Sequence, residues 1–344
     1  MTTPAQIRFA AIGLNHGHIH GQTRMLLNAG AELVSFYAPE EDLSAAYQKA
    51  FPQARRAGSA AEILEDSTIQ LVASAAIPSE RAAIGIQAMR HGKDFCSDKP
   101  GFTTFQQLSE ARRVQAETKR IYSIFYSERL ETRSTEKAGE LVQAGAIGQV
   151  IQTLGLGPHR TNIPSRPAWF FQKQHYGGIL CDIGSHQVEQ FLYFTQSTAA
   201  EVVFSQVANY KHPQYPGLED FGDMVLRSTK GTGYIRVDWY TPEGLPVWGD
   251  GRLFILGTEG YMELRKYCDV AGRPGGDHLF LCDQKGMRYI DCKNAELPYG
   301  PRLVYDVVHR TETAMPQAHT FLAMELALRA EAQAQRLGNL RPEA

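Results

Sequence analysis

The chain has 344 residues, a hydrophobic fraction of 43% and a formal net charge of −2 from 35 basic and 37 acidic side chains. This length exceeds what one hydrophobic core usually organises, so we expect two domains. The near balance of charges excludes the strongly basic surface that nucleic-acid binding requires. No apolar run approaches the roughly 20 residues that span a bilayer, and the five scattered cysteines are typical of a reducing compartment. We therefore expect a cytoplasmic protein with no membrane or nucleic-acid partner.

Strand-like and helix-like segments alternate over residues 1–127. A short apolar strand runs into Gly13 and a helical stretch, and two further apolar strands are each followed by a helical segment before the sequence reaches Asp98. Such alternation is typical of a parallel sheet with helices on both faces, whose ligands bind beyond the carboxyl ends of the strands. The sequence thus predicts an α/β protein whose first domain is a doubly wound, Rossmann-type sheet.

Longer strands joined by tight turns dominate residues 128–344. Strand-like runs lie at 149–157, 200–210, 221–229, 233–241, 252–256, 261–266, 279–281 and 288–292. Helical patterns lie at 177–195 and in a long alanine-rich segment at 317–337. We expect a second, α+β domain with a large, open, mostly antiparallel sheet and a C-terminal helix.

The turn after the first strand departs from the dinucleotide-binding template, which requires three glycines. Gly13, Asn15 and His18 occupy the three places, so only the first matches, although Gly17 also offers backbone without a side chain. Asparagine tolerates left-handed backbone better than most residues. The motif alone leaves both a cofactor site and a plain strand, turn and helix open.

His16, His18 and His20 raise the question of a metal site, because imidazole is a common zinc ligand. Alternate positions on a helix point about 200° apart, so only His16 and His20 would share a face. No cysteine or carboxylate stands at a suitable spacing. We expect no metal, and hydrogen bonds to phosphate, a helix cap or ordinary surface positions for these histidines.

The second strand ends without the acidic residue that usually binds the ribose of NAD about 20 positions beyond the glycine turn. Ala38 occupies that place, and Glu40 or Glu41 would have to reach the ribose instead. No neighbouring arginine is available for the 2′-phosphate of NADP. If a nicotinamide cofactor binds, the sequence favours NAD over NADP.

Two polar segments could provide acid–base chemistry. Asp98-Lys99-Pro100 follows a buried-looking strand, and the segment from Gly177 to His186 places Asp182 and His186 four residues apart. On a helix these two side chains share a face, so the carboxylate could orient a histidine that accepts a proton. A surface Lys-Pro turn and an Asp–His brace at a helix start are the structural alternatives.

The order of these segments resembles the glucose-fructose oxidoreductase / inositol dehydrogenase / MocA (Gfo/Idh/MocA) family over nearly the whole chain. The resemblance rests on the turn at Gly13 and on the segments 71–78, 92–100, 145–150 and 177–186, the last being the most specific. It implies a Rossmann domain that binds NAD or NADP, and an open-sheet domain that often forms subunit contacts. The usual reaction of the family oxidises a sugar or polyol hydroxyl or reduces the matching ketone.

The resemblance also implies roles for single residues. Lys99 would hydrogen-bond the reacting hydroxyl, Asp182 would position the substrate or orient the base, and His186 would take the proton. The implied cofactor site comprises Gly13, Asn15, His16, Gly17, His18, Glu40, Pro78, Asp98 and Pro100. The sequence departs from the family in having Asp98 in place of glutamate, Arg81 where a histidine is frequent, and Ala38 at the ribose position.

Substrate contacts are expected by resemblance just upstream of the segment 177–186. His159 and Arg160 could bind hydroxyls, and Trp169 could stack on a sugar ring. Tyr126 and Arg129, at the expected domain junction, are further candidates. A packed aromatic crossing is an equally good interpretation of the residues around Trp169.

The sequence thus predicts an NAD(P)-dependent oxidoreductase that interconverts a secondary hydroxyl and a ketone on a carbohydrate-like small molecule. We expect a homodimer or homotetramer. Two alternative functions remain. One is an NAD-dependent glycosidase of the same fold. The other is a ligand-sensing family member without catalytic activity, which would explain the incomplete glycine motif and Ala38 at the ribose position.

Overall fold

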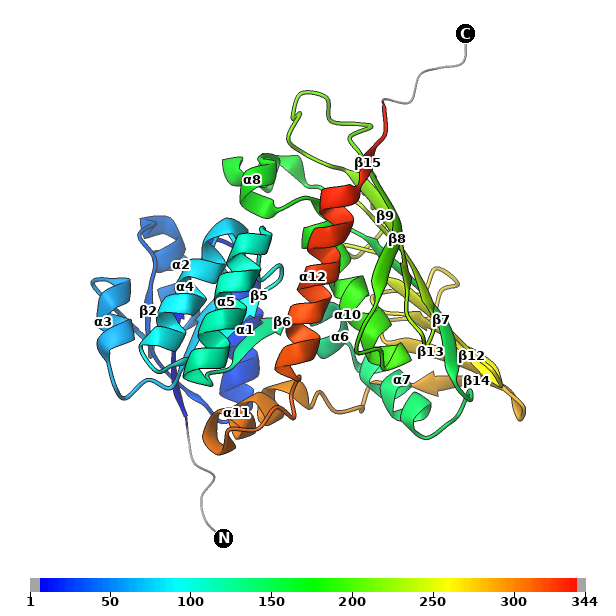
Figure 1. The fold of residues 1–344 in the computed structure, drawn as a ribbon, viewed down its shortest axis with the longest axis horizontal. Coiled ribbons are helices and arrows are strands. Elements are labelled where there is room, and N and C mark those ends of the chain that lie inside the picture. The colour runs from blue at the N-terminus through cyan, green and yellow to red at the C-terminus, as the bar shows by residue number, and fades with distance from the viewer. Residues whose placement is uncertain (1–6, 339–344) are drawn as a thin grey trace. The chain divides into compact units, whose positions relative to one another are not determined.

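The computed structural model describes residues 7–338, which form two compact units (Figure 1). The first unit comprises residues 7–125 and 298–321, and the second comprises 126–297 and 322–338. The chain first passes from one unit to the other after residue 125, two residues before the boundary expected after residue 127. It returns to the first unit over residues 298–321, which a single boundary does not describe. Among the described residues, no helix combines the length and apolar character needed to cross a membrane.

The first unit is built on a six-stranded sheet in which all paired strands are parallel, in the order β3-β2-β1-β4-β5-β6. The strands are β1 (Arg8–Ile12), β2 (Glu32–Tyr37), β3 (Arg55–Arg56), β4 (Leu71–Ser74), β5 (Asp94–Asp98) and β6 (Tyr122–Phe125). The helices are α1 (His18–Asn28), α2 (Glu41–Ala50), α3 (Ala60–Glu65), α4 (Pro78–Arg90), α5 (Phe105–Thr118) and α11 (Tyr299–His309). The predicted Rossmann fold is confirmed. Strands β4, β5 and β6 are buried at every position, as expected for parallel strands covered on both faces.

The segment 298–321 covers the edge strand β6 of this sheet. The Tyr122 backbone N–H donates to Gln317 Oε1 at 2.8 Å, and the hydroxyls of Ser123 and Tyr299 lie 2.6 Å apart. The Phe321 ring packs beside those of Phe102 and Tyr122. An edge strand with unpaired backbone groups invites association with other chains, so this segment completes the unit.

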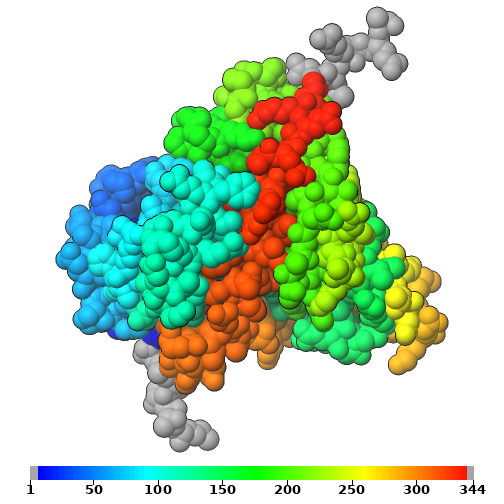
Figure 2. Space-filling model, in the orientation of Figure 1, coloured from blue at the N-terminus to red at the C-terminus, as the bar shows by residue number. Residues whose placement is uncertain are grey.

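The second unit contains a nine-stranded sheet in the order β14-β13-β12-β11-β7-β10-β9-β8-β15. Only the pairs β7–β10 and β8–β15 are parallel, so the predicted open, mostly antiparallel sheet is confirmed. Its strands are β7 (Val150–Pro158), β8 (Glu201–Ala208), β9 (Phe221–Arg227), β10 (Thr232–Asp238), β11 (Arg252–Gly257), β12 (Gly260–Arg265), β13 (His278–Asp283), β14 (Gly286–Asp291) and β15 (Gln335–Arg336). The hairpin of β13 and β14 forms one edge of the sheet (Figure 1). Its residues fall in the yellow to orange part of the colour scale of the space-filling view (Figure 2).

Helices cover one face of this sheet. They are α6 (Ser127–Leu130), α7 (Arg133–Gln143), α8 (Lys173–Tyr176), α9 (Ile179–Asp182), α10 (Gly184–Thr195) and α12 (Gln317–Gln333), with single 3₁₀ turns at Ile163–Ser165 and Ala168–Phe171. Glycines on the strands let α10 approach closely. A Cβ on Gly155 would lie 2.5 Å from Gln187 Oε1, and one on Gly233 would lie 2.7 Å from the Phe191 ring.

Two helices differ from their predicted extents. The helix expected at 177–195 is divided at Ile183 into α9 and α10, and the helix expected to continue to Leu337 ends at Gln333. Beyond it, β15 pairs with the edge strand β8, and the Leu337 N–H donates to Val207 O at 2.9 Å. The backbone groups of residues 335–337 are thus hydrogen-bonded to β8 instead of within a helix, which the helical pattern of the sequence does not reveal.

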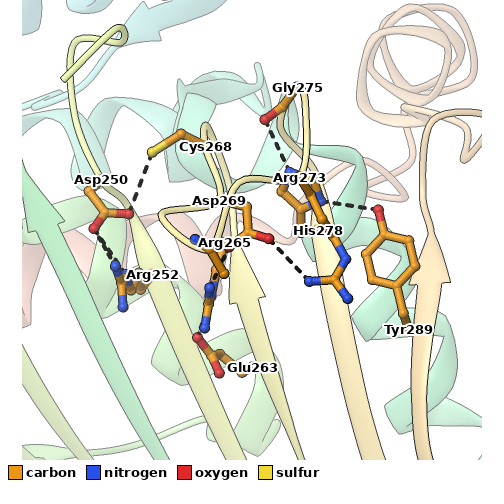
Figure 3. A network of polar contacts seen from close by, with 11 residues as sticks. Asp250, Arg252, Glu263, Arg265, Cys268, Asp269, Arg273, Gly275, His278 and Tyr289 are labelled. Carbon is orange, nitrogen blue, oxygen red and sulfur yellow. Dashed lines mark hydrogen bonds and ion pairs between the residues drawn. The ribbon is translucent and has the colours of Figure 1, made fainter.

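A network of charged side chains holds the loop between β12 and β13 in place (Figure 3). The Asp269 carboxylate pairs with Arg265 and with Arg273, whose Nη1 is 3.3 Å away, and it accepts the Ala271 N–H at 2.9 Å. Nearby, His278 lies 3.0 Å from the Tyr289 hydroxyl. These contacts fix the shape of the loop on the second unit.

Candidate functional site

In the first unit, the glycine turn lies where the carboxyl ends of β1 and β4 come closest. Gly13 has a φ of +79°, and a Cβ there would lie 2.4 Å from the Ala76 Cβ. The Gly13 N–H donates to Tyr37 O and its carbonyl accepts from the Ala75 N–H, at 3.0 and 3.1 Å. Only glycine fits this position, so the one match to the dinucleotide template is structurally required.

Asn15 and Glu40, both predicted cofactor residues, are in direct contact. The Asn15 side-chain amide donates to Glu40 Oε1 at 2.7 Å, which fixes the carboxylate just beyond the end of β2. Ala38, at the usual acidic position, is buried. Helix α1 starts only at His18, with exposed Gly17 at its N-cap, rather than directly after Gly13.

His16 precedes the helix, so the expectation that only His16 and His20 would share a face is wrong. The rings of His16 and His18 are 4.1 Å apart, and Asp98 arrives from β5 with its carboxylate oxygens 3.6 and 3.0 Å from their Nδ1 atoms. These three ligand atoms lie within 4.8 Å of one another. His16 Nδ1 accepts the His18 backbone N–H, and burial and the neighbouring His18 hold the pKa of His16 well below its usual value. A neutral His16 is therefore expected at pH 7.

Arg81 completes this cluster and received no role from sequence reasoning, although its departure from the family's histidine was a signal. Its guanidinium is fully buried, lies 3.1 Å from Asp98 Oδ2, and donates to the carbonyls of Ala76 and Pro100 at 2.7 and 3.2 Å. Arg81 also donates to the Lys99 carbonyl. Burial alone would raise the pKa of Asp98, but the charges of His18 and Arg81 hold it far below its usual range.

The hydrogen bonds of Arg81 to the carbonyls of Lys99 and Pro100 hold the backbone at Lys99 in place. Lys99 follows the last residue of β5, is 4% exposed, and precedes Pro100 across a cis peptide bond. Pro78, another predicted cofactor residue, is buried in the first turn of α4, the helix that carries Arg81. The predicted cofactor residues of the first unit thus lie at or beyond the ends of β1, β2, β4 and β5.

In the second unit, Asp182 ends α9 and His186 lies in the first turn of α10. His186 is 1% exposed and packs edge-on to the Tyr126 ring, with 6.4 Å between centroids, whereas Asp182 is partly exposed. The Asp182 charge acts on Arg166, whose pKa burial lowers and Asp182 raises in part. Orientation of His186 by Asp182 remains a prediction.

Glu128 is the residue of this region that sequence reasoning missed. Its buried carboxylate accepts from Gln187 Nε2 at 2.6 Å and from Lys266 Nζ at 3.1 Å, and it lies 3.9 Å from His159 Nε2. Burial alone would raise the pKa of Glu128, but Lys266, His186 and His159 lower it to about 2. A permanent negative charge therefore faces both histidines. Nothing in the local sequence distinguishes Glu128 from a surface glutamate.

The predicted substrate residues Arg129, Arg160 and Trp169 differ in their burial and in their contacts. Arg129 is buried and pairs with Glu189 at 2.7 Å and Glu136 at 3.0 Å, and a contact with substrate remains a prediction. Arg160 donates to backbone carbonyls, including Pro242 O at 3.0 Å. Trp169 is half-buried beside Phe170.

The His159 ring lies within an aromatic group of the second unit. Its centroid is 4.5 Å from that of Trp248 and 5.4 Å from that of Trp239. The Arg166 guanidinium lies 4.4 Å above Phe170 and 5.0 Å above Trp239. His159, Phe170, Trp239 and Trp248 therefore form one aromatic group, with Arg166 stacked on two of its rings.

Comparison with known proteins gives consistent matches over both units. Residues 7–126 match the model of the "Oxidoreductase family, NAD-binding Rossmann fold", and residues 135–263 match the "GFO/IDH/MocA C-terminal domain". A structure from Erwinia carotovora atroseptica SCRI1043, of a protein assigned as an oxidoreductase, is 48% identical, with a TM-score of 0.94 over 97% of this chain and 100% of that one.

Two further solved structures share the fold at lower identity. Levoglucosan dehydrogenase, in complex with NADH and levoglucosan, is 15% identical with a TM-score of 0.80 over 95% of this chain and 98% of that one. The myo-inositol 2-dehydrogenase from Lactobacillus plantarum is 18% identical with a TM-score of 0.75 over 96% and 98%. The matches to curated relatives span from 33% to 56% of the length of those proteins.

Proposed function

Because the chain belongs to the Gfo/Idh/MocA family of oxidoreductases, we propose that it interconverts a secondary hydroxyl and a ketone on a sugar or polyol by hydride transfer. The observation that supports this most directly is the placement of Lys99 at the end of β5, with its carbonyl held by buried Arg81. A lysine whose backbone is held at the carboxyl end of a parallel Rossmann strand suits a reacting oxygen that gains negative charge.

The residues of the first unit fit a nicotinamide dinucleotide. Gly13 leaves bare backbone where any Cβ would collide with Ala76, and Glu40 is held by Asn15 beyond the end of β2. Gly13, Asn15, His16 and His18 would hold the pyrophosphate, and Glu40 the ribose. When bound, the nicotinamide ring supplies or accepts the hydride.

The preference for NAD over NADP follows from charge. The Glu40 carboxylate, fixed by Asn15, favours the ribose hydroxyls and opposes a 2′-phosphate. We expect tighter binding of NAD than of NADP. A fluorescence titration of the reduced cofactors would reveal the opposite order if another group accommodates the phosphate.

Side chains of the protein would accept the proton of the reacting hydroxyl and stabilise the charge on its oxygen. His186 would accept the hydroxyl proton during oxidation, and Lys99 would stabilise the oxygen as charge develops on it. Asp182 would orient the substrate or His186. The negative charge of Glu128 favours the protonated form that His186 would then adopt.

The substrate is proposed as a polyhydroxylated ring. The family neighbours named after levoglucosan and myo-inositol act on ligands of that kind, and the aromatic group around His159 offers surfaces on which a sugar ring could stack.

A panel of cyclic sugars and polyols, scored by the absorbance of reduced cofactor, tests the proposal. We expect net cofactor reduction with at least one compound, and His186→Ala should lower kcat by about 100-fold to 10,000-fold while cofactor affinity is retained. His309→Ala, at the last position of α11, is a matched control. Turnover unaffected in His186→Ala would contradict the assignment, and absence of cofactor binding would favour a sensor.

A further inference from the structure

The turn before α9, at Gly177 and Gly178, lies in close contact with the carboxylate of Glu331, which is on α12 of the same unit. Gly177 and Gly178 have φ values of +91° and +95°, and a Cβ on Gly178 would lie 2.1 Å from the carboxyl carbon of Glu331, on α12. Gly178 therefore does more than permit a turn. It allows a side chain 153 positions later in the sequence to reach the backbone at the start of α9.

Two glutamates accept the first amide protons of α9. The Ile179 N–H donates to Glu219 Oε2 at 3.0 Å, and the Leu180 N–H donates to Glu331 Oε2 at 3.1 Å. The first N–H groups of a helix have no acceptor within it, and negative charge there is favourable. Asp182 follows within the same turn, since its N–H donates to Gly178 O at 2.8 Å.

A lysine joins the two carboxylates. Lys173 Nζ lies 2.6 Å from Glu219 Oε1 and also contacts Glu331, and the side chains of Glu219 and Glu331 are only 3% and 7% exposed. Arg336 lies 3.1 Å from the same oxygen of Glu219. We call Lys173, Glu219 and Glu331 the clamp.

A tyrosine fixes the backbone of the clamp. The Tyr176 hydroxyl accepts the Glu219 N–H at 2.9 Å and donates to Gly217 O at 3.1 Å. The clamp thus connects α8, the segment before β9, α12 and the start of α9. It contains no residue of the predicted catalytic set.

We propose that Glu219 and Glu331 are positioning residues, which hold the start of α9 and thereby set the orientation of Asp182 and the following His186. This inference rests on the function proposed above. Ile183 links the two side chains, because its N–H donates to Ile179 O at 3.0 Å and its carbonyl accepts the His186 N–H at 3.2 Å. A shift at the start of α9 is therefore transmitted through two consecutive turns to His186.

The clamp also changes its charge near neutral pH. Burial and the adjacent Glu219 raise the pKa of Glu331 to about 7, against the opposing charge of Lys173. The other groups that face the pair are Tyr176, whose raised pKa keeps it neutral, and Arg336. Glu331 is therefore mostly protonated below about pH 7 and carries a negative charge beside Lys173 above it.

Three variants test the clamp. Glu331→Ala removes the acceptor of the Leu180 N–H, while Glu331→Gln keeps an acceptor oxygen and cannot titrate. Glu325→Ala is the matched control, because Glu325 lies on the same helix and pairs with exposed Arg329 at 2.8 Å. The readouts are kcat and KM for a sugar substrate, cofactor affinity, and hydrogen exchange of the amides at 179–186.

We expect Glu331→Ala to lower kcat by about 10-fold to 100-fold, as misplaced catalytic groups do, with cofactor affinity within about two-fold because that site lies in the first unit. Exchange at Ile179 and Leu180 should accelerate. Glu331→Gln should recover most of the kcat, and Glu325→Ala should resemble the wild type. Equal kcat and exchange in Glu331→Ala and Glu325→Ala would overturn the proposal.

Two further outcomes are decisive. If Glu331→Ala does not fold, the pH profile of Glu331→Gln decides. Besides the limb set by the base His186, the wild type should show a transition near pH 7 that is missing in Glu331→Gln, and identical profiles would refute the role. If the wild type turns over no sugar, the proposed function fails while the exchange data still test the clamp. Unchanged exchange at Ile179 and Leu180 in Glu331→Ala would then reject it.

Discussion

At the scale of single residues, the buried pair of Arg81 and Asp98 is the most consequential feature of the first unit. Both side chains are fully buried, and Arg81 additionally donates to three backbone carbonyls. Breaking a buried ion pair by removing one partner leaves an uncompensated charge, which costs about 3–5 kcal/mol. The pair therefore combines fold stability with the placement of Lys99.

Arg81→Ala should accordingly lower the free energy of unfolding by about 3–5 kcal/mol, measured by denaturant titration. The control is Arg113→Ala, which removes an exposed guanidinium from ion pairs with Glu110 and Glu117 and should leave the midpoint nearly unchanged. Equal midpoints for both variants would show that the buried pair contributes little.

The same pair predicts a pH dependence of stability. Because the pKa of Asp98 is held far below its usual range in the folded state, its contribution is present above about pH 4, the unfolded value, and is lost as the pH falls further. In Arg81→Ala the acid-dependent part of the unfolding free energy should shrink. Unfolding curves between pH 2 and pH 6 would measure this, and parallel curves for variant and wild type would argue against it.

Glu128 allows a prediction about catalysis. Removing its negative charge disfavours protonation of the histidines that face it. In Glu128→Gln we expect the acidic limb of the kcat/KM profile to move to lower pH, since the base then remains neutral in more acidic solution. The amide keeps a hydrogen-bonding group beside Gln187 and Lys266. An unshifted limb would separate Glu128 from the acid–base step.

At the scale of elements, the Gly178 turn can be tested by a comparison of two glycines. Gly178 and Gly145 both have positive φ, but a Cβ on Gly145 would meet nothing within 4 Å. Gly145→Ala should cost only the strain of a left-handed residue, about 1–2 kcal/mol, whereas Gly178→Ala must also displace Glu331. A larger loss of unfolding free energy in Gly178→Ala is expected, and equal losses would mean that Glu331 moves aside freely.

The elements show what local sequence can and cannot predict. Alternation of apolar strands with helical segments was sufficient for the Rossmann unit, and strand-rich texture was sufficient for the mostly antiparallel sheet. The cluster of His16, His18 and Asp98 was not predictable from spacing, because Asp98 lies 80 positions beyond His18 and the two meet only after β1 and β5 enter one sheet. The helix break at Ile183 and the short strand β15 likewise depend on tertiary partners.

The candidate site divides in the same way. Gly13, Lys99, Asp182 and His186 were found through motif and resemblance, since each belongs to a contiguous segment. Arg81 and Glu128 were not assigned a role, because their importance comes from burial and from charges contributed by distant segments. The ion pairs of buried Arg129 with Glu136 and Glu189 were not predictable for the same reason, and its role at the substrate stays a prediction.

At the scale of the whole molecule, the open face of the large sheet bears on assembly. Gln152, Leu154, Phe254 and Leu256 line a groove of about 320 Å³ on this face, and Leu256 is 41% exposed. Exposed apolar patches on a sheet commonly mark subunit interfaces. We propose that this face takes part in the homodimer or homotetramer expected from the sequence.

Leu256→Arg should shift this oligomer toward monomer, as measured by sedimentation velocity. Tyr305→Arg is the control, because Tyr305 is 50% exposed on α11, in the first unit. Identical sedimentation of the wild type and Leu256→Arg would place the interface elsewhere.

The return of residues 298–321 to the first unit affects how the protein is made. The edge of β6 is covered through Gln317, Tyr299 and Phe321, so this sheet cannot be completed until nearly the whole chain has left the ribosome. Domains usually fold in order from the N-terminus during synthesis. Residues 126–297 carry eight of the nine strands of the second sheet and are made before residues 298–321, so the edge of β6 stays uncovered while they are synthesised. A fragment ending near residue 127 should consequently aggregate, whereas one that joins 7–125 to 298–321 has the parts of a complete sheet.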